Sequence, residues 1–489
     1  MSSIANTTTA HAESASVETR RRWWVNGWRP ADPGPTYDIT RIDGDIPREI
    51  HGTFFRNGPS QKVLPEAGFE ALHFFDGDGL VHAFRFDDGR VWYRGRFVED
   101  PTFRVEQEEG RFCLSSVGIG IGNPTDRIPV RQQHNTNVVW HAGKLWALVE
   151  NAPPFALDPS TLGPRGEDTL GGKLLGMATT AHPKIDGRSG ELVIHGYQPF
   201  APYVQFYVVA PNGTCTVAEN VDAPFPGMMH DLAITEHYAV FFLPPVVVDA
   251  DRIMRPGRPF AEAFLWKPEL GFWLGVRRRE AGAATRWLRV PTEGFVFHPG
   301  NAYENGDRIL VDACTYLDGT AFLRSLETFR RGDLERNWFA RPFLYEIDLA
   351  RGRVAERQLD ERGCEFPRLD DRRVGFRNRF GYAVRNRGHG YSPGDSWATI
   401  VRYDREGGRS AEHDFSVGRW ASEPVFVARA ADAEEDDGFL LTVVYDGPND
   451  ASDLVILDAA NVDAEPLAVA HLEHRIPMGF HGNFVPGLV

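Results

Sequence analysis

Four histidines are framed alike along the chain, and together their side chains could bind a transition metal. His182 lies in "TTAHPKID", His230 in "GMMHDLAI", His298 in "GFVFHPGN" and His481 in "PMGFHGNF". Each follows an apolar or small residue and precedes Pro, Gly or Asp, as expected where a buried strand begins at the rim of a channel. Because a lone buried histidine is usually structural, the shared framing is what indicates a metal site assembled from separate strands.

Histidine suits this task because a neutral imidazole supplies a nitrogen donor without cancelling the charge of the metal. Four protein ligands also leave coordination positions open for other molecules. No H-E-x-x-H or H-x-H motif brings two of the four histidines together, so separate strands must position them. The ligand type alone is compatible with iron, zinc or copper.

The net charge and the cysteine spacing exclude several classes of protein. The formal charge of −15, with no basic run longer than three arginines, argues against a nucleic-acid partner. The cysteines lie far apart and form no C-x-x-C pair, which argues against a disulfide framework and a zinc–thiolate site. We expect reduced, mostly buried thiols at Cys113, Cys215, Cys314 and Cys364.

The chain shows no pattern for secretion or membrane insertion. Its N-terminus lacks an apolar signal segment, and the longest apolar run, "YAVFFLPPVVV", is interrupted by two prolines. We therefore expect a soluble, cytoplasmic protein.

Short alternating segments behind Gly and Asp turns recur along the chain and must position the histidines. Examples are "DDGRVWYRGRF", "HAGKLWALVE", "RSGELVIHGY" and "EDDGFLLTVVYD". This patterning predicts an all-β protein, and a β-propeller accommodates 489 residues as one closed domain without exposed edges. Residues 1–22 are small and polar, so we expect a disordered tail there and a single propeller domain at residues 23–489.

The chain is long for a bare propeller. Seven blades would average about 67 residues each, well above the roughly 40–45 residues of a four-stranded blade. Long insertions are therefore expected. The stretches 250–290 and 315–342 are rich in Phe, Trp, Arg and Pro, and we expect them to form a helical and loop cap over one end.

Longer segments around the four histidines carry a more specific pattern. They include "HGTFFRNGPSQ", "HNTNVVWHAGKLWALVENAPPFALDPSTL", "TAHPKIDGRSGEL", "MMHDLAITEHYAVFF", "FHPGNAYENGD", "CEFPRLDDR" and "GFHGNF". In this order they closely resemble the carotenoid cleavage oxygenase family, and the resemblance runs from about residue 38 to the C-terminus.

The resemblance implies a seven-bladed β-propeller with Fe(II) on its axis and the cap over the iron centre. It implies that the four ligands map onto His182, His230, His298 and His481. Positions left open on the metal would take O₂ and substrate. The assignment of iron follows from the resemblance alone.

The resemblance also implies residues around the ligands. The family uses three glutamates as hydrogen-bond acceptors for the second nitrogen of the ligand histidines. They map onto Glu150, Glu365 and Glu423, as partners of His230, His298 and His481 in that order, and His182 has none. Thr136 in "HNTN" matches a family residue near the open metal position, where it would limit how O₂ and water approach.

The function implied is a non-haem Fe(II)-dependent dioxygenase. It would cleave a C=C double bond of a carotenoid or apocarotenoid into two carbonyl products. The protein would supply a dry, mostly apolar tunnel that presents one double bond of the polyene to the metal. Collecting such a substrate would bring peripheral contact with a membrane, for which Phe242, Leu243 and residues 246–248 are candidates, although their burial in the core fits the sequence equally well.

Two alternatives remain open from the sequence. Within the family, stilbene- or phenylpropene-cleaving oxygenases of the lignostilbene dioxygenase type hold a phenol oxygen with Tyr and Lys. Phe97 stands at the matching position here, and the segment before "HNTN" has no lysine. Outside enzymes, a propeller could bind a lipid or protein partner and keep the histidines as a relic. The cleaved bond, the preferred isomer and the oligomeric state stay undetermined.

Overall fold

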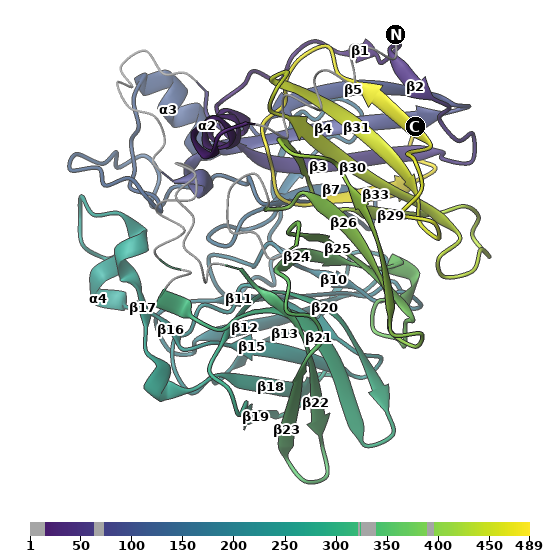
Figure 1. Ribbon diagram of the computed structural model, residues 1–489. Helices are drawn as coiled ribbons and strands as arrows, with labels where there is room; N and C mark the ends of the chain where they lie inside the picture. The colour runs from purple at the N-terminus through teal and green to yellow at the C-terminus, as the bar shows by residue number, and fades with distance from the viewer. Residues whose placement is uncertain (1–14, 63–72, 321–322, 324–338, 389–395) are drawn as a thin grey trace.

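Seven antiparallel sheets surround a central axis in the computed structural model, which describes residues 15–62, 73–320, 323, 339–388 and 396–489 (Figure 1). Each of these sheets has at least four strands, and each forms one blade. The predicted all-β, seven-bladed propeller is confirmed. We number the blades in chain order from the sheet that contains the first long strand.

Blade 1 joins the two ends of the described chain. In spatial order its strands are β1 (Tyr37–Asp38), β5 (Arg90–Phe97), β4 (Asp78–Asp87), β3 (Gly52–Ser60) and β33 (Gly482–Pro486). Strand β33 comes from the C-terminal end and pairs with β3, with Gly52 opposite Pro486. Backbone hydrogen bonds therefore close the ring, so that no sheet edge is left open at this point.

Blades 2 to 4 follow along the chain. Blade 2 contains β6 (Asn137–His141), β7 (Lys144–Leu148), β8 (Phe155–Leu157) and β9 (Pro164–Glu167). Blade 3 contains β10 (Lys184–Ile185), β11 (Leu192–Tyr197), β12 (Val204–Val209) and β13 (Cys215–Val221). Blade 4 contains β14 (Leu232–Ile234), β15 (Tyr238–Leu243), β18 (Trp273–Arg278) and β19 (Thr285–Arg289).

Blades 5 to 7 complete the ring. Blade 5 contains β20 (Phe295–Asn305), β21 (Arg308–Tyr316), β22 (Arg341–Asp348) and β23 (Arg353–Gln358). Blade 6 contains β24 (Cys364–Arg368), β25 (Phe380–Arg385), β26 (Thr399–Asp404) and β27 (Arg409–Asp414). Blade 7 contains β2 (Ile42–Gly44), β32 (Ala468–His471), β31 (Ala451–Asp458), β30 (Gly438–Asp446) and β28 (Arg419–Ala421), and β29 (Val425–Ala428) also pairs with β30.

Tight hairpin turns set the register within the blades. Between β4 and β5, Asp88 and Gly89 have φ angles of 44° and 73°. Between β6 and β7, Ala142 and Gly143 have φ angles of 50° and 76°. Two successive residues of positive φ form the turn whose twist matches that of paired strands, which explains the Gly at the second position.

Two insertions form a cap on one side of the propeller. One lies between β15 and β18 and contains β16 (Val246–Val248), α4 (Ala250–Ile253), η2 (Phe260–Ala263), β17 (Phe264–Trp266) and η3 (Pro268–Leu270). The other lies between β5 and β6 and contains α3 (Pro101–Glu109), on the same side as α4 in Figure 1. The two insertions meet where the amide of Phe260 donates to the carbonyl of Ser116 at 2.8 Å.

The expected cap segments need correction. Residues 273–278 and 285–289 form blade strands β18 and β19, so the insertion expected at 250–290 ends earlier, before Trp273. Of the stretch expected at 315–342, residues 321–322 and 324–338 lie outside the described residues. The segment with α3 was not predicted as part of the cap. The short helices η1 (Phe74–Asp76) and η5 (Asp371–Arg373) lie elsewhere in the fold.

The expected boundary of the N-terminal tail is also wrong. Helix α2 spans Val17–Gly27, and its N-cap Ser16 accepts a hydrogen bond from the amide of Thr19. Trp24 anchors this helix because its fully buried ring packs against Trp397 and Trp420, with centroid distances of 5.7 and 5.8 Å. Residues 1–14 of the expected tail lie outside the described residues.

The apolar residues suggested for membrane contact lie in the core. Phe242, Leu243, Val246 and Val248 are all at most 3% exposed, and they pack in three hydrophobic clusters. They are therefore unable to reach a bilayer in this structure. Within the described residues, the helices fall short of the length and apolar character needed to cross a membrane.

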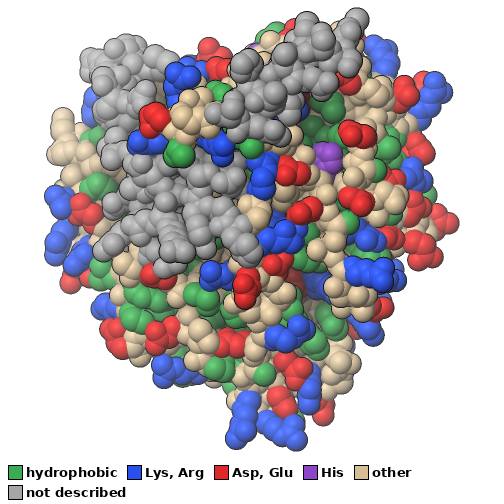
Figure 2. Space-filling model, in the orientation of Figure 1, with side chains coloured by type: hydrophobic (Ala, Val, Ile, Leu, Met, Phe, Trp, Pro, Cys, Tyr) green, Lys and Arg blue, Asp and Glu red, His purple; other side chains and the backbone are tan. Residues whose placement is uncertain are grey.

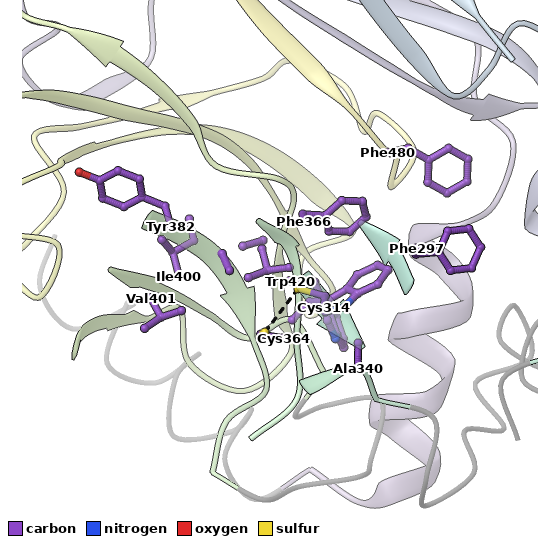
Figure 3. Packing of buried hydrophobic residues seen from close by; sticks show 14 of the residues in the cluster. Phe297, Cys314, Ala340, Cys364, Phe366, Tyr382, Ile400, Val401, Trp420 and Phe480 are labelled. Atoms are coloured by element: carbon purple, nitrogen blue, oxygen red, sulfur yellow. Dashed lines mark hydrogen bonds between the residues drawn. The ribbon is translucent and has the colours of Figure 1, made fainter. Parts of the chain in front are cut away.

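The charged surface and the state of the cysteines agree with what the sequence predicts. On the face in Figure 2, acidic and basic side chains are interspersed over the described residues. All four cysteines are free, and three of them are buried. The sulfur atoms of Cys314 and Cys364 lie 3.6 Å apart between blades 5 and 6 (Figure 3).

Candidate metal centre

Each of the seven blades supplies one of the four histidines and three glutamates predicted around the metal. The histidines lie at the start of the innermost strands of four blades, and the glutamates come from the other three. They are His182 before β10, His230 before β14, His298 in β20, His481 before β33, Glu150 after β7, Glu365 in β24 and Glu423 between β28 and β29.

The structure brings all four histidine rings together. The ring centroid of His182 lies 4.5 Å from that of His230, 5.0 Å from that of His298 and 4.6 Å from that of His481. The nearest ring nitrogens of His182, His298 and His481 lie within 4.8 Å of one another. Nε2 of His230 lies 3.3 Å from Nε2 of His298.

These nitrogens fit a shared metal ion. Two nitrogen ligands at about 2.1 Å from one ion and at a right angle to each other lie about 3 Å apart. In addition, Nε2 of His182 is buried and has no hydrogen-bond partner among the described residues. Burial lowers the pKa of His182, His230 and His481, which favours the neutral ring that binds metals. The donor set is therefore suited to a divalent transition metal.

Three of the four histidines direct their other nitrogen at a carboxylate. Nδ1 of His298 lies 2.6 Å from Oε2 of Glu365, and Nδ1 of His481 lies 3.0 Å from Oε1 of Glu423; the third pair is formed by His230 and Glu150. An N–H that donates to a carboxylate fixes both the tautomer and the orientation of the ring. In all three rings Nε2 is thereby left free to face the centre.

Tyrosine hydroxyls hold two of these carboxylates. The hydroxyl of Tyr316 donates to Oε1 of Glu365 at 2.9 Å, and the hydroxyl of Tyr197 donates to Oε2 of Glu150. Each glutamate thus uses one oxygen for its histidine and the other for a tyrosine. Neither tyrosine could be predicted from the sequence, because each lies on a strand of a neighbouring blade, far from its glutamate in the sequence.

The third carboxylate, Glu423, is held by an arginine instead of a tyrosine. Nη1 of Arg368 donates to Oε2 of Glu423 at 3.1 Å, and the amide of Gly482 donates to the same oxygen at 2.9 Å. Burial by itself would raise the pKa of Glu423, but Arg368 and His481 hold it down at about 2. Glu423 therefore stays an anion and keeps accepting from His481.

The structure places Thr136 beside the centre through its backbone. Its carbonyl oxygen accepts from the amide of His481 at 3.3 Å, and its hydroxyl donates to Oδ1 of Asn135 at 3.2 Å. Thr136 is buried and comes directly before β6. Its neighbour Asn137 reaches the next blade, where its side-chain amide donates to the carbonyl of Ala181 at 2.8 Å.

Aromatic rings pack directly on the histidines. The ring of Phe297 lies 4.1 Å from that of His230, and the ring of Phe366 lies 5.6 Å from that of His298 and 5.1 Å from that of His481. Phe297, Phe366 and Phe480 belong to one cluster of buried hydrophobic side chains (Figure 3). These rings come from residues adjacent to a histidine or to Glu365 in the sequence, so the same strands carry the ligands and their apolar surroundings.

A cavity of about 210 Å³ also opens onto the histidines. His182, His298 and His481 line it, together with charged side chains from four blades. These side chains are Lys184, Asp231, Arg368, Asp371 and Glu423. The centre is therefore in contact both with aromatic rings and with a polar compartment.

Comparisons with known proteins agree with this architecture. The family described as retinal pigment epithelial membrane protein (RPE65) matches residues 29–486. Lignostilbene-alpha,beta-dioxygenase isozyme III of Sphingomonas paucimobilis is 33% identical over 466 residues, which cover 91% of this chain and 92% of that protein. Apocarotenoid-15,15'-oxygenase of Synechocystis sp. is 32% identical over 491 residues, which cover 94% of this chain and 96% of that protein.

A solved structure supports the same conclusion. The crystal structure of cobalt-substituted Synechocystis ACO matches with a TM-score of 0.85 and 28% sequence identity, covering 95% of this chain and 99% of that chain. The histidine cluster and the metal in that relative together indicate a metal centre here. The fold, the site and the match over nearly the whole chain lead to one identification: the chain belongs to the RPE65/carotenoid cleavage oxygenase family.

Proposed function

We propose that this chain is a non-haem Fe(II)-dependent dioxygenase that cleaves a C=C double bond of a carotenoid or apocarotenoid to give two carbonyl products. The observation that carries the proposal is the buried cluster of four histidines, three of them paired with carboxylates. Such a set holds a divalent metal firmly and leaves coordination positions open. In our proposal His182, His230, His298 and His481 are the ligands, and Fe(II) would supply the activation of O₂.

The chain's own residues would hold and shield the reacting groups. Phe297 and Phe366 cover the histidines with apolar surface, which keeps bulk water away and suits an apolar substrate. Glu150, Glu365 and Glu423 orient the rings. We propose that Thr136, beside His481, limits how O₂ and water approach the centre.

The runner-up is cleavage of a stilbene or phenylpropene. Identities of 33% to a lignostilbene dioxygenase and 32% to an apocarotenoid oxygenase favour neither substrate class. The carotenoid proposal is supported by Phe97, which packs with Leu80 and Phe103 in an apolar cluster and has no hydroxyl to bind a phenol. A phenol site depends on such a hydrogen bond, whereas a polyene is recognised through apolar contact.

A substrate panel tests the proposal. The Fe(II) protein is incubated aerobically with a β-apocarotenal, a longer carotenoid, resveratrol and isoeugenol, and the aldehyde products are separated by chromatography. We expect the polyenes to be cleaved far faster, with label from ¹⁸O₂ in both fragments. Preferred turnover of a 4-hydroxystilbene, with its 4-methoxy analogue inert, would establish the runner-up in place of the carotenoid reading.

Two broader proposals accompany this one. We propose that the chain from helix α2 onward acts as one catalytic domain, since Trp24 anchors this helix on the propeller and β3 and β33 close the ring. We also propose a cytoplasmic location, because all four cysteines are free, as is usual for proteins kept in a reducing compartment.

A further inference from the structure

Among the four histidines of the cluster, His182 has no carboxylate partner in the described residues, but an ion pair lies beside it. We propose that the ion pair between Lys184 and Asp231 positions His182 and ties it to His230. Lys184 and Asp231 are thus positioning residues of the metal centre. This inference rests on the proposed function, because it assigns the pair a role toward the metal that the histidines would hold.

The geometry of the pair links two ligand segments. Lys184 follows His182 by two residues, and Asp231 directly follows His230. Nζ of Lys184 donates to both carboxylate oxygens of Asp231, at 2.6 Å to Oδ1 and 2.8 Å to Oδ2. The side chain of Asp231 is 2% exposed and that of Lys184 is 19% exposed. A buried, doubly hydrogen-bonded pair of this kind holds its two backbones at one separation.

The pair also crosses a blade boundary. Lys184 begins β10, the first strand of blade 3, and Asp231 directly precedes β14, the first strand of blade 4. On the other side, Asn137 of blade 2 donates to the carbonyl of Ala181, the residue before His182. The segment that carries His182 is therefore fixed from both neighbouring blades. A carboxylate on its ring is unnecessary if its backbone is held in this way.

Charge balance explains why an ion pair serves here. Lys184 and Asp231 line the cavity onto which His182 and His298 open, so both charges lie close to the ligands. Paired, they add no net charge beside a divalent cation. Unpaired, a buried ammonium would repel the metal, whereas a buried carboxylate would compete with the histidines for it.

Binding of Co(II) to the full-length protein tests the proposal without depending on turnover. Affinity is measured by competition with a chelator, and the absorption spectrum of bound Co(II) reports the coordination geometry. We expect Lys184→Met and Asp231→Asn each to lower Co(II) affinity by about 10-fold or more and to change the spectrum. Lys184→Arg keeps a cation that can donate to both oxygens of Asp231, and it should stay within about 3-fold of wild type.

Lys144→Met is the matched control. Lys144 pairs with Asp168 at 2.7 Å at the start of β7, in blade 2, so the substitution removes a Lys–Asp ion pair, though a more exposed one, away from the histidines. We expect its Co(II) affinity and spectrum to be those of wild type. An equal loss in Lys144→Met would overturn the inference, because any lost ion pair would then have the same effect.

Two further outcomes separate this inference from the proposed function. If wild-type protein binds Co(II) and folded Asp231→Asn binds it with unchanged affinity and spectrum, the pair has no positioning role and the inference alone fails. If wild-type protein has no Co(II) site, the proposed function fails and this inference with it. Asp231→Asn preserves side-chain size, so it decides the question even if Lys184→Met does not fold.

Discussion

The histidines of the centre are held in two different ways. His230, His298 and His481 are each fixed at the ring, by a carboxylate that is itself held by a tyrosine or an arginine. His182 is fixed through its backbone, between the hydrogen bond of Asn137 and the ion pair of Lys184. The carboxylates control the tautomer and the rotation of a ring, whereas the contacts of the His182 segment control only the position of its backbone.

This difference follows from the limited number of positions that one propeller axis offers for ligands and for the carboxylates that hold them. Seven blades offer seven positions around the axis, and four of them are occupied by histidines. The three positions that remain supply one carboxylate for each of three rings, so a fourth ring must be held by other means. The number of blades thus accounts for the uneven support of the histidines.

The largest effect is expected when a histidine of the centre is replaced, whether its ring is held by a carboxylate or through its backbone. His298→Ala and His182→Ala should both abolish metal binding and activity, because each deletes a donor nitrogen whatever supports it. Metal content after purification and dialysis measures this. His237→Ala is the control, since His237 also faces a carboxylate, Glu304 at 3.0 Å, but lies at the surface. Full metal content in His182→Ala would mean that His182 is not a ligand.

A smaller effect is expected when Glu423, the carboxylate that Arg368 holds, is replaced. Glu423→Ala should lower metal affinity by about 10- to 100-fold, because the ring of His481 loses its orientation. Glu423→Gln should lose less, since the amide oxygen still accepts from Nδ1. Chelator competition measures both variants. Wild-type affinity and rate in Glu423→Ala would show that the carboxylate has no part in holding the ring.

The smallest effect should come from the tyrosines. Tyr316→Phe and Tyr197→Phe should lower metal affinity by less than about 10-fold, because each hydroxyl acts on the ring only through a glutamate. The matched control is Tyr345→Phe, because the buried hydroxyl of Tyr345 is hydrogen-bonded to Thr315 at 2.8 Å. A loss in Tyr316→Phe as large as in Glu423→Ala would contradict this order of effects.

The framing of the histidines could be predicted from the sequence because it is local. Each histidine of the centre lies where an apolar strand begins, and a strand start at the axis is visible as a short pattern around the residue. The resemblance then supplied the three glutamates. The hairpins could be predicted in the same way, since Asp–Gly turns act over two residues.

The residues that were missed have partners in other blades. Tyr316 reaches Glu365 from blade 5 to blade 6, and Lys184 reaches Asp231 from blade 3 to blade 4. Such contacts depend on how blades pack, which no local pattern records. Helix α2 was missed for a similar reason, because the packing of Trp24 against blades 6 and 7, rather than its own periodicity, stabilises it.

The most direct test of the account is the metal content of the purified protein. Anaerobic reconstitution with Fe(II), followed by removal of loose metal and elemental analysis, should give about one iron per chain for wild type and none for His298→Ala. Turnover of a polyene should follow the iron content. A wild-type protein that stays free of iron, or one whose turnover persists without it, would contradict the proposal that the four histidines form a catalytic metal centre.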